Sequence, residues 1–153
     1  MNLVVDSGNS FSKLGLFENN VIIDRFQFKK LTLNNIEKIF YQRKITNSIF
    51  SNVGEPNNKV LKFLRQNSNL VNFNSKLKIP FTNKYRSIET LGSDRIGLVS
   101  QASKLYSNKN ILIIDIGTSI TYDFLNEKNE YLGGNISPGL NMKFKALNNQ
   151  THN

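Results

Sequence analysis

Apolar and polar residues alternate along the first 28 positions in the way that is typical of short β-strands rather than of helices. Small polar residues, Gly and Asn interrupt the alternation twice, and such clusters mark turns. The pattern predicts three strands, over residues 2–6, 13–18 and 21–28. Because the turns between them are short, we expect the strands to pair antiparallel.

Helical spacing then alternates with short apolar runs. Thr32 is a suitable N-cap for a first helix ending near Arg43, and Pro56 is placed to open a second. A third helix is expected to follow residues 91–95. The inner faces are predicted to hold Ile36, Ile39 and Phe40 in the first helix, Val60, Leu61 and Leu64 in the second, and Ile96, Val99, Ala102, Leu105 and Tyr106 in the third. Strands are expected over residues 45–53 and 70–73, which gives the order β-β-β-α-β-α-β-α.

The pattern of the first strands begins again at residue 111. The expected elements are strands over 111–115 and 120–125, a strand starting at Tyr131, and a helix over 140–147. This restart predicts an internal duplication at low sequence identity. We therefore expect one lobe over residues 1–108 and the incomplete start of a second lobe over residues 109–153. The strands of that second lobe are expected to lack covering helices and to leave an apolar surface and an open edge.

Each lobe has a carboxylate and a glycine where its first strand ends. Asp6 and Gly8 stand in the first copy, and Asp115 and Gly117 in the second. A glycine lets the backbone turn tightly, which leaves N–H groups facing a ligand such as phosphate, while the carboxylate can hold a cation. Two such turns suggest two related lobes closing on one nucleotide, although either turn alone is also what a plain hairpin would show.

The chain has 153 residues, 39% of them apolar, which is typical of a globular protein. Its net charge of +9 invites a nucleic-acid hypothesis, but the basic residues are scattered rather than clustered, so no nucleic-acid partner is expected. There is no cysteine, no apolar run long enough for a membrane helix and no signal peptide, so we expect a cytoplasmic protein without a membrane partner.

Four stretches together resemble type III pantothenate kinase, within the superfamily of acetate and sugar kinases, heat-shock ATPases and actin. They are residues 6–17, Tyr85 with residues 91–96, residues 115–123, and residues 131–140. The resemblance implies an α/β fold of actin-like ATPase (ribonuclease H-like) lobes. It implies transfer of phosphate from ATP to pantothenate, giving 4′-phosphopantothenate in the first step of coenzyme A synthesis.

The resemblance also assigns the nucleotide and metal residues. Asp6 would hold Mg²⁺, and Asp115 a monovalent cation, K⁺ or NH₄⁺. The residues implied in ATP binding are Asp6, Ser7, Gly8, Asn9, Ser10, Phe11, Ser12, Lys13 and Thr118. Asp123 and Thr121 share a strand face, and for Asp123 three roles remain open: assisting the metal, holding Thr118, or making a strand-end hydrogen bond.

For the acceptor substrate, the resemblance implies Tyr85, Gly92, Ser93, Asp94 and Arg95. Asp94 would be the general base for the substrate hydroxyl, and Arg95 would meet an anionic group such as the pantothenate carboxylate. A plain helix-start carboxylate at Asp94 and a half-buried loop aromatic at Tyr85 are the structural alternatives. Glu89 stands where many relatives have Pro, and the only histidine, His152, is assigned no role.

Members of this family are longer, so the resemblance implies that the remainder supplies adenine contacts and part of the substrate pocket. We expect an active enzyme to be a homodimer, and this chain alone to have little activity. Two alternatives remain: a non-catalytic nucleotide-binding fragment or accessory regulator of the same fold, and a basic nucleic-acid-binding protein.

Overall fold

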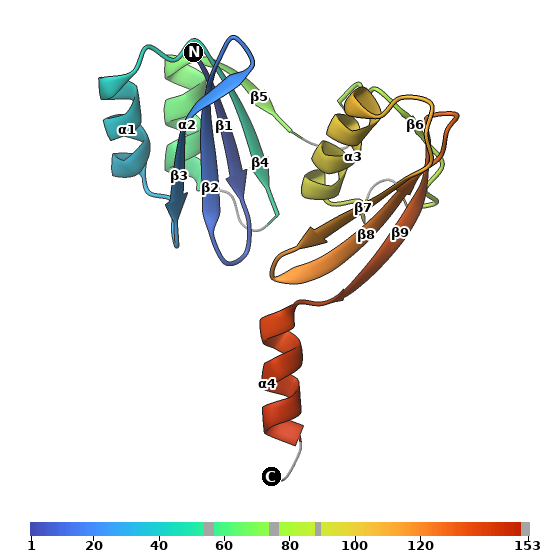
Figure 1. Ribbon diagram of the computed structural model, residues 1–153. Coiled ribbons are helices and arrows are strands. Elements are labelled where there is room, and N and C mark those ends of the chain that lie inside the picture. The colour runs from blue at the N-terminus through green and yellow to red at the C-terminus, as the bar shows by residue number, and fades with distance from the viewer. Residues whose placement is uncertain (54–56, 74–76, 88–89, 151–153) are drawn as a thin grey trace. The chain divides into compact units, whose positions relative to one another are not determined.

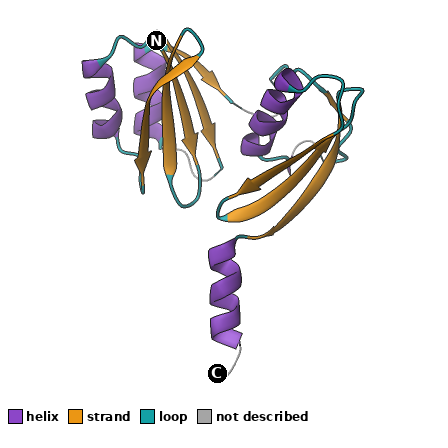
Figure 2. Ribbon diagram, in the orientation of Figure 1, coloured by secondary structure: helices purple, strands orange, loops and turns teal. Residues whose placement is uncertain are grey.

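The computed structural model describes residues 1–53, 57–73, 77–87 and 90–150 (Figure 1). Contacts divide the chain into two compact units, Met1–Asn74 and Ser75–Asn153. Each unit combines a β-sheet with helices, as the α/β prediction required (Figure 2). No helix in the described part of the chain is long and apolar enough to cross a membrane.

The first unit is a five-stranded sheet with two helices on one face (Figure 2). Its elements are β1 (Asn2–Ser7), β2 (Ser12–Glu18), β3 (Val21–Phe28), α1 (Leu33–Gln42), β4 (Asn47–Asn52), α2 (Asn58–Asn67) and β5 (Asn69–Asn72). The strand order is β3-β2-β1-β4-β5. The first three strands pair antiparallel, as predicted, while β4 and β5 run parallel to β1.

Alternation along the strands and two capped helices explain this unit. Leu3 and Val5 of β1 are fully buried beneath the helices, whereas Val4 between them lies on the other face. Thr32 caps α1 as predicted, in a capping box with Asn35. Asn57 caps α2, while Pro56, which was expected to open this helix, lies outside the described residues.

The second unit is a four-stranded sheet with the order β6-β9-β8-β7. Its elements are β6 (Thr82–Asn83), α3 (Ser93–Leu105), β7 (Ile111–Ile116), β8 (Ser119–Leu125), β9 (Glu130–Pro138) and α4 (Leu140–Gln150). The helix α3 packs against β7 and β8. The strand β6 was not predicted, because two residues are too short to show an alternating pattern.

The two faces of the second sheet differ in their exposure to solvent. Thr121, Asp123 and Leu125 of β8 are buried, whereas Leu112 and Ile114 of β7 are more than half exposed. The predicted apolar surface is therefore present on one face, but the expectation that these strands lack covering helices was wrong for the other face, where α3 packs on β7 and β8. No side chain of α4 is buried among its residues 140–150.

Along the sequence, the boundary between the two compact units follows residue 74, whereas the predicted lobe boundary follows residue 108. The difference concerns α3, which follows the first copy of the strand pattern in sequence but packs on the strands of the second. Contacts describe how the chain packs and the repeat describes how its pattern recurs, so the lobe boundary at residues 108 and 109 stays a prediction.

Candidate active site

The turn between β1 and β2 is built on Gly8 and closed by two serines. The Gly8 amide donates a hydrogen bond to the Phe11 carbonyl oxygen at 3.1 Å, and a Cβ on Gly8 would lie 3.2 Å from that oxygen. The Ser7 and Ser12 hydroxyls lie 3.3 Å apart, and Ser12 is buried. Small residues therefore fix the turn, while Asn9, Ser10 and Phe11 at its tip are exposed.

Asp6 and Lys13 face one another across the hairpin. They are cross-strand partners, and they lie on the sheet face away from the core because their neighbours Val5 and Leu14 point into it. A groove of about 380 Å³ on this face has a mostly apolar lining, with Asp6, Lys13 and Arg25 as its charged residues. A carboxylate and two cationic side chains at one groove have the charges that a metal–phosphate group requires.

The turn between β7 and β8 in the second unit likewise has an aspartate on the strand before it and a glycine in the turn, but it is one residue shorter. Asp115 pairs with Thr121 across the hairpin, and the Gly117 amide donates to the Ser119 carbonyl oxygen at 2.9 Å. The Gly139 amide donates to the Thr118 carbonyl oxygen at 3.1 Å. The start of α4 therefore lies directly against this turn.

The hydroxyl of Thr121 is buried without a hydrogen-bond partner among the described residues. Its residue is the direct cross-strand partner of Asp115, so the two side chains leave the same face of the sheet. A buried hydroxyl oxygen normally has a partner, because leaving one unpaired costs free energy. An oxygen-seeking cation at Asp115 would supply that partner.

Asp94 lies in the first turn of α3, as the sequence predicted. The helix is capped by Gly92 without a side-chain hydrogen bond, and Asp94 Oδ1 accepts the Arg95 amide at 2.9 Å. Asp94 is half-buried, and its Oδ2 makes no hydrogen bond among the described residues. One carboxylate oxygen is thus held by the backbone while the other remains available to a ligand.

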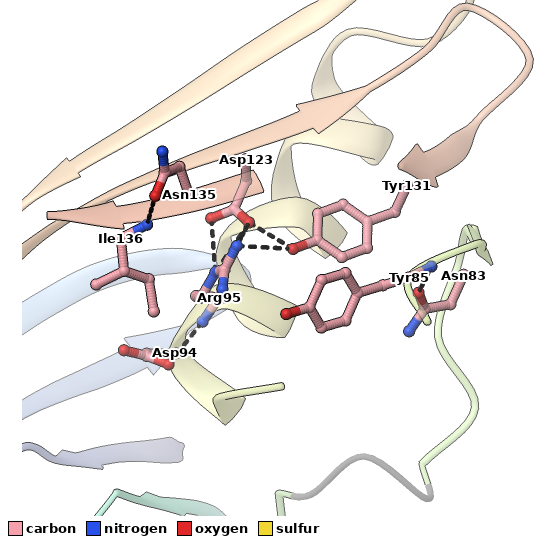
Figure 3. Close-up of polar contacts among 8 residues, drawn as sticks. All are labelled: Asn83, Tyr85, Asp94, Arg95, Asp123, Tyr131, Asn135 and Ile136. Carbon is pink, nitrogen blue, oxygen red and sulfur yellow. Dashed lines mark hydrogen bonds and ion pairs between the residues drawn. The ribbon is translucent and has the colours of Figure 1, made fainter. Parts of the chain in front are cut away.

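Arg95 is the centre of a buried polar network (Figure 3). Its Nε donates to both oxygens of Asp123, at 2.9 Å and 3.2 Å, and its Nη2 donates to Asp123 Oδ1 at 2.6 Å. Tyr131 completes the network, since its hydroxyl accepts from Nη2 at 3.1 Å and donates to Asp123 Oδ1 at 2.6 Å. Asp123 and Tyr131 are fully buried, so three elements meet around one buried charge pair.

Burial and pairing shift the pKa values of this network. Burial alone would lower the pKa of Arg95, but the hydrogen bond and charge of Asp123 outweigh it, so the net pKa is raised. Burial raises the pKa of Tyr131 well above its usual value, and the hydrogen bond to Asp123 raises it further. Arg95 is therefore charged and Tyr131 neutral at physiological pH.

Tyr85 lies beside the network. Its ring centroid is 6.0 Å from Arg95 Cζ and 6.1 Å from the ring of Tyr131, and Figure 3 shows both rings directed toward Arg95. Gly133 makes room for it: its φ of 102° suits glycine, and a Cβ there would lie 2.7 Å from the Tyr85 ring. Tyr85, which precedes Asp94 in one of the resemblance motifs, therefore lies close to Arg95 in the structure.

The structure brings several predicted residues together within each unit. Residues 6–13 span the β1–β2 turn and the adjoining strand ends in the first unit, and in the second unit Tyr85 lies beside Arg95. For Asp123, the structure shows hydrogen bonds to Arg95 and Tyr131. The role of Tyr131 was not predicted, although the residue stands in one of the four resemblance motifs.

Solved structures place the fold in a known class. The chain superposes on a putative 2-dehydro-3-deoxygalactonokinase from Sinorhizobium meliloti with a TM-score of 0.57 at 12% identity, over 99% of this chain and 58% of that one. It superposes on a conserved putative Baf family transcriptional activator from Campylobacter jejuni with a TM-score of 0.60 at 25% identity, over 97% and 60%. The fold is that of actin-like ATPases and sugar kinases.

Sequence relatives define the family within that class. A family model for type III pantothenate kinase matches residues 2–153. The type III pantothenate kinases of Christiangramia forsetii and Flavobacterium johnsoniae are 43% and 37% identical, over 100% and 99% of this chain. The chain belongs to the type III pantothenate kinase family. It spans 64% and 63% of the length of these two relatives, which is less than two thirds.

Proposed function

We propose that this chain takes part in the ATP-dependent phosphorylation of pantothenate to 4′-phosphopantothenate, the first step of coenzyme A biosynthesis. The observation that carries the proposal is the start of α3, where Asp94 has an available carboxylate oxygen beside a permanently charged arginine. The family match includes this segment. The hydroxyl oxygen of the substrate would attack the γ-phosphorus of ATP while Asp94 accepts the hydroxyl proton, and ADP would leave.

The other roles follow from charge and position. Arg95 would meet the pantothenate carboxylate through Nη1, the nitrogen that Asp123 and Tyr131 do not use. Tyr85 would form the wall beside it. In the first unit, the Gly8 turn would offer backbone N–H groups to the ATP phosphates, with Lys13 as a further cation.

Two cation sites are part of the proposal, one for Mg²⁺ and one for a monovalent cation. Among the described residues no group of three or more His, Cys, Asp or Glu side chains could hold a metal on its own. Mg²⁺ commonly binds through one or two carboxylates plus substrate phosphates, and Asp6 would be its carboxylate. For a monovalent cation, K⁺ or NH₄⁺, the pair of Asp115 and the orphaned Thr121 hydroxyl fits oxygen ligation.

The test measures product directly. The chain is incubated at high concentration with ATP, pantothenate, Mg²⁺ and K⁺, and 4′-phosphopantothenate is detected by mass spectrometry. Slow product formation is expected, because the chain spans less than two thirds of its relatives, and Asp94→Asn should abolish it. Asp24→Asn, on the exposed strand β3, is a matched control that should leave the rate unchanged. Product formation unaffected by Asp94→Asn would overturn the assignment of the base.

A nucleotide-binding regulator of the same fold is the second candidate, favoured by the likeness to the Campylobacter jejuni protein, a putative transcriptional activator. ATP raising the melting temperature, with no effect of pantothenate and no product, would support it over the kinase. We further propose a homodimer in the cytoplasm. Sedimentation of the chain at several concentrations tests the dimer, and a strictly monomeric chain would contradict it for this chain.

A further inference from the structure

The guanidinium of Arg95 is fixed along one edge only. Nε and Nη2 point at Asp123 and Tyr131, with four donor–acceptor distances between 2.6 and 3.2 Å. A guanidinium is planar and rigid, so fixing one edge also fixes the direction of the remaining N–H groups. Within residues 1–53, 57–73, 77–87 and 90–150, no hydrogen bond involves Nη1.

The surroundings leave the guanidinium little freedom. Its Nη2 would lie 3.0 Å from a Cβ at Gly134, so the β9 backbone closes one side, and the Tyr85 ring lies 6.0 Å from Cζ. The backbone of the same residue donates to Asp94 Oδ1 at 2.9 Å. Whatever holds the Arg95 side chain therefore also restrains the first turn of α3, which carries the proposed base.

We propose that Asp123 and Tyr131 are positioning residues that hold Arg95 by one edge, present its Nη1 to the anionic group of the substrate, and keep the first turn of α3 in place. The part concerning the substrate rests on the proposed function, whereas the part concerning α3 does not. Asp123 supplies the charge that keeps Arg95 buried. Tyr131, neutral at physiological pH, can accept from Arg95 and donate to Asp123 at once.

The first experiment needs no substrate. Hydrogen exchange by NMR is measured for Arg95 Nε–H and the Ile96 amide at the start of α3, and for the Tyr106 amide at its end, which donates to the Ala102 carbonyl oxygen at 2.9 Å. Tyr131→Phe should accelerate the first two at least tenfold more than the third. Equal acceleration at both ends, or none, would overturn the proposal.

Tyr122→Phe is the matched control. It makes the same chemical change on the neighbouring strand β8, at a hydroxyl with no hydrogen bond among the described residues, and should leave all three rates unchanged. If it accelerates the start of α3 as Tyr131→Phe does, the effect does not come from the network and the proposal fails.

The second experiment tests substrate presentation. Pantothenate is compared with pantothenol, in which a neutral alcohol replaces the carboxylate. Tyr131→Phe should raise the KM or Kd for pantothenate about tenfold, with less effect on kcat and none on the affinity for pantothenol. Equal losses for both ligands would overturn the presentation of Nη1. If the parent chain binds neither ligand, the proposed function fails, and the exchange rates still decide whether Tyr131 positions α3.

Discussion

Replacing Asp123 with Asn measures how much the second unit depends on one buried ion pair. Asp123 is 0% exposed and the Arg95 side chain 7%, so water can compensate little of the loss of either charge. Removing one partner of such a pair costs about 3–5 kcal/mol. Asn keeps the shape and one acceptor oxygen, so we expect a loss near the lower limit, about 3 kcal/mol.

Native-state hydrogen exchange of the β8 and β9 amides measures this loss directly. Because each 1.4 kcal/mol corresponds to a tenfold change, amides that exchange by unfolding of this unit should exchange about 150-fold faster. The exposed pair of Lys84 and Glu130, at 3.7 Å, provides the control, and Lys84→Gln should have almost no effect. Similar exchange rates in the two variants would refute the expectation that the buried pair stabilises this unit.

Three further predictions concern other features. Burial and the bond to Asp123 raise the pKa of Tyr131, so at high pH the folded chain keeps the phenol proton while the unfolded chain releases it. This contribution to stability is therefore full below a pH of about 10 and is lost above it. The fall in the urea midpoint with rising pH should accordingly be smaller in Tyr131→Phe. Gly139→Ala would place a Cβ against the carbonyl oxygens of Gly117 and Thr118. The apparent affinity for ATP, measured from the rise in melting temperature with ATP concentration, should therefore fall at least tenfold, and an unchanged affinity would show that this turn has no part in binding. Ile114→Lys, on the exposed face of β7, should reduce light scattering at high concentration without lowering the melting temperature, and unchanged scattering would show that this face does not drive association.

The parts of the fold that sequence predicted are those specified by local signals. Alternation determined β1, β2 and β3, and Thr32 with Asn35 forms a capping box that any helix start of this kind would use. The strand β6 lacks such a signal, because its two residues pair with β9, nearly fifty positions later. Packing of α3 on β7 and β8 is likewise a long-range property that no local pattern contains.

In the candidate site, too, the residues with a local sequence signal were predicted and those that depend on long-range pairing were not. Asp94 and Arg95 were predicted at a helix start, and the structure places them there. The partners of Arg95 were not predicted, because they depend on the register of β8 and β9, which shifts at an irregularity between Phe124 and Leu125. A slip of one residue would turn Asp123 to the other face of the sheet, and strand sequences alone do not fix such a shift.

The order of residues in the buried network has a consequence during protein synthesis. Arg95 emerges from the ribosome before both of its partners, and Tyr131 comes 36 positions later. Asp123, which carries the opposite charge, comes 28 positions after Arg95, and until it is made burial of the guanidinium would leave a charge unpaired. Docking of α3 is therefore expected to follow synthesis of β8, and a pause in translation before residue 123 would leave the helix exposed to proteases and chaperones.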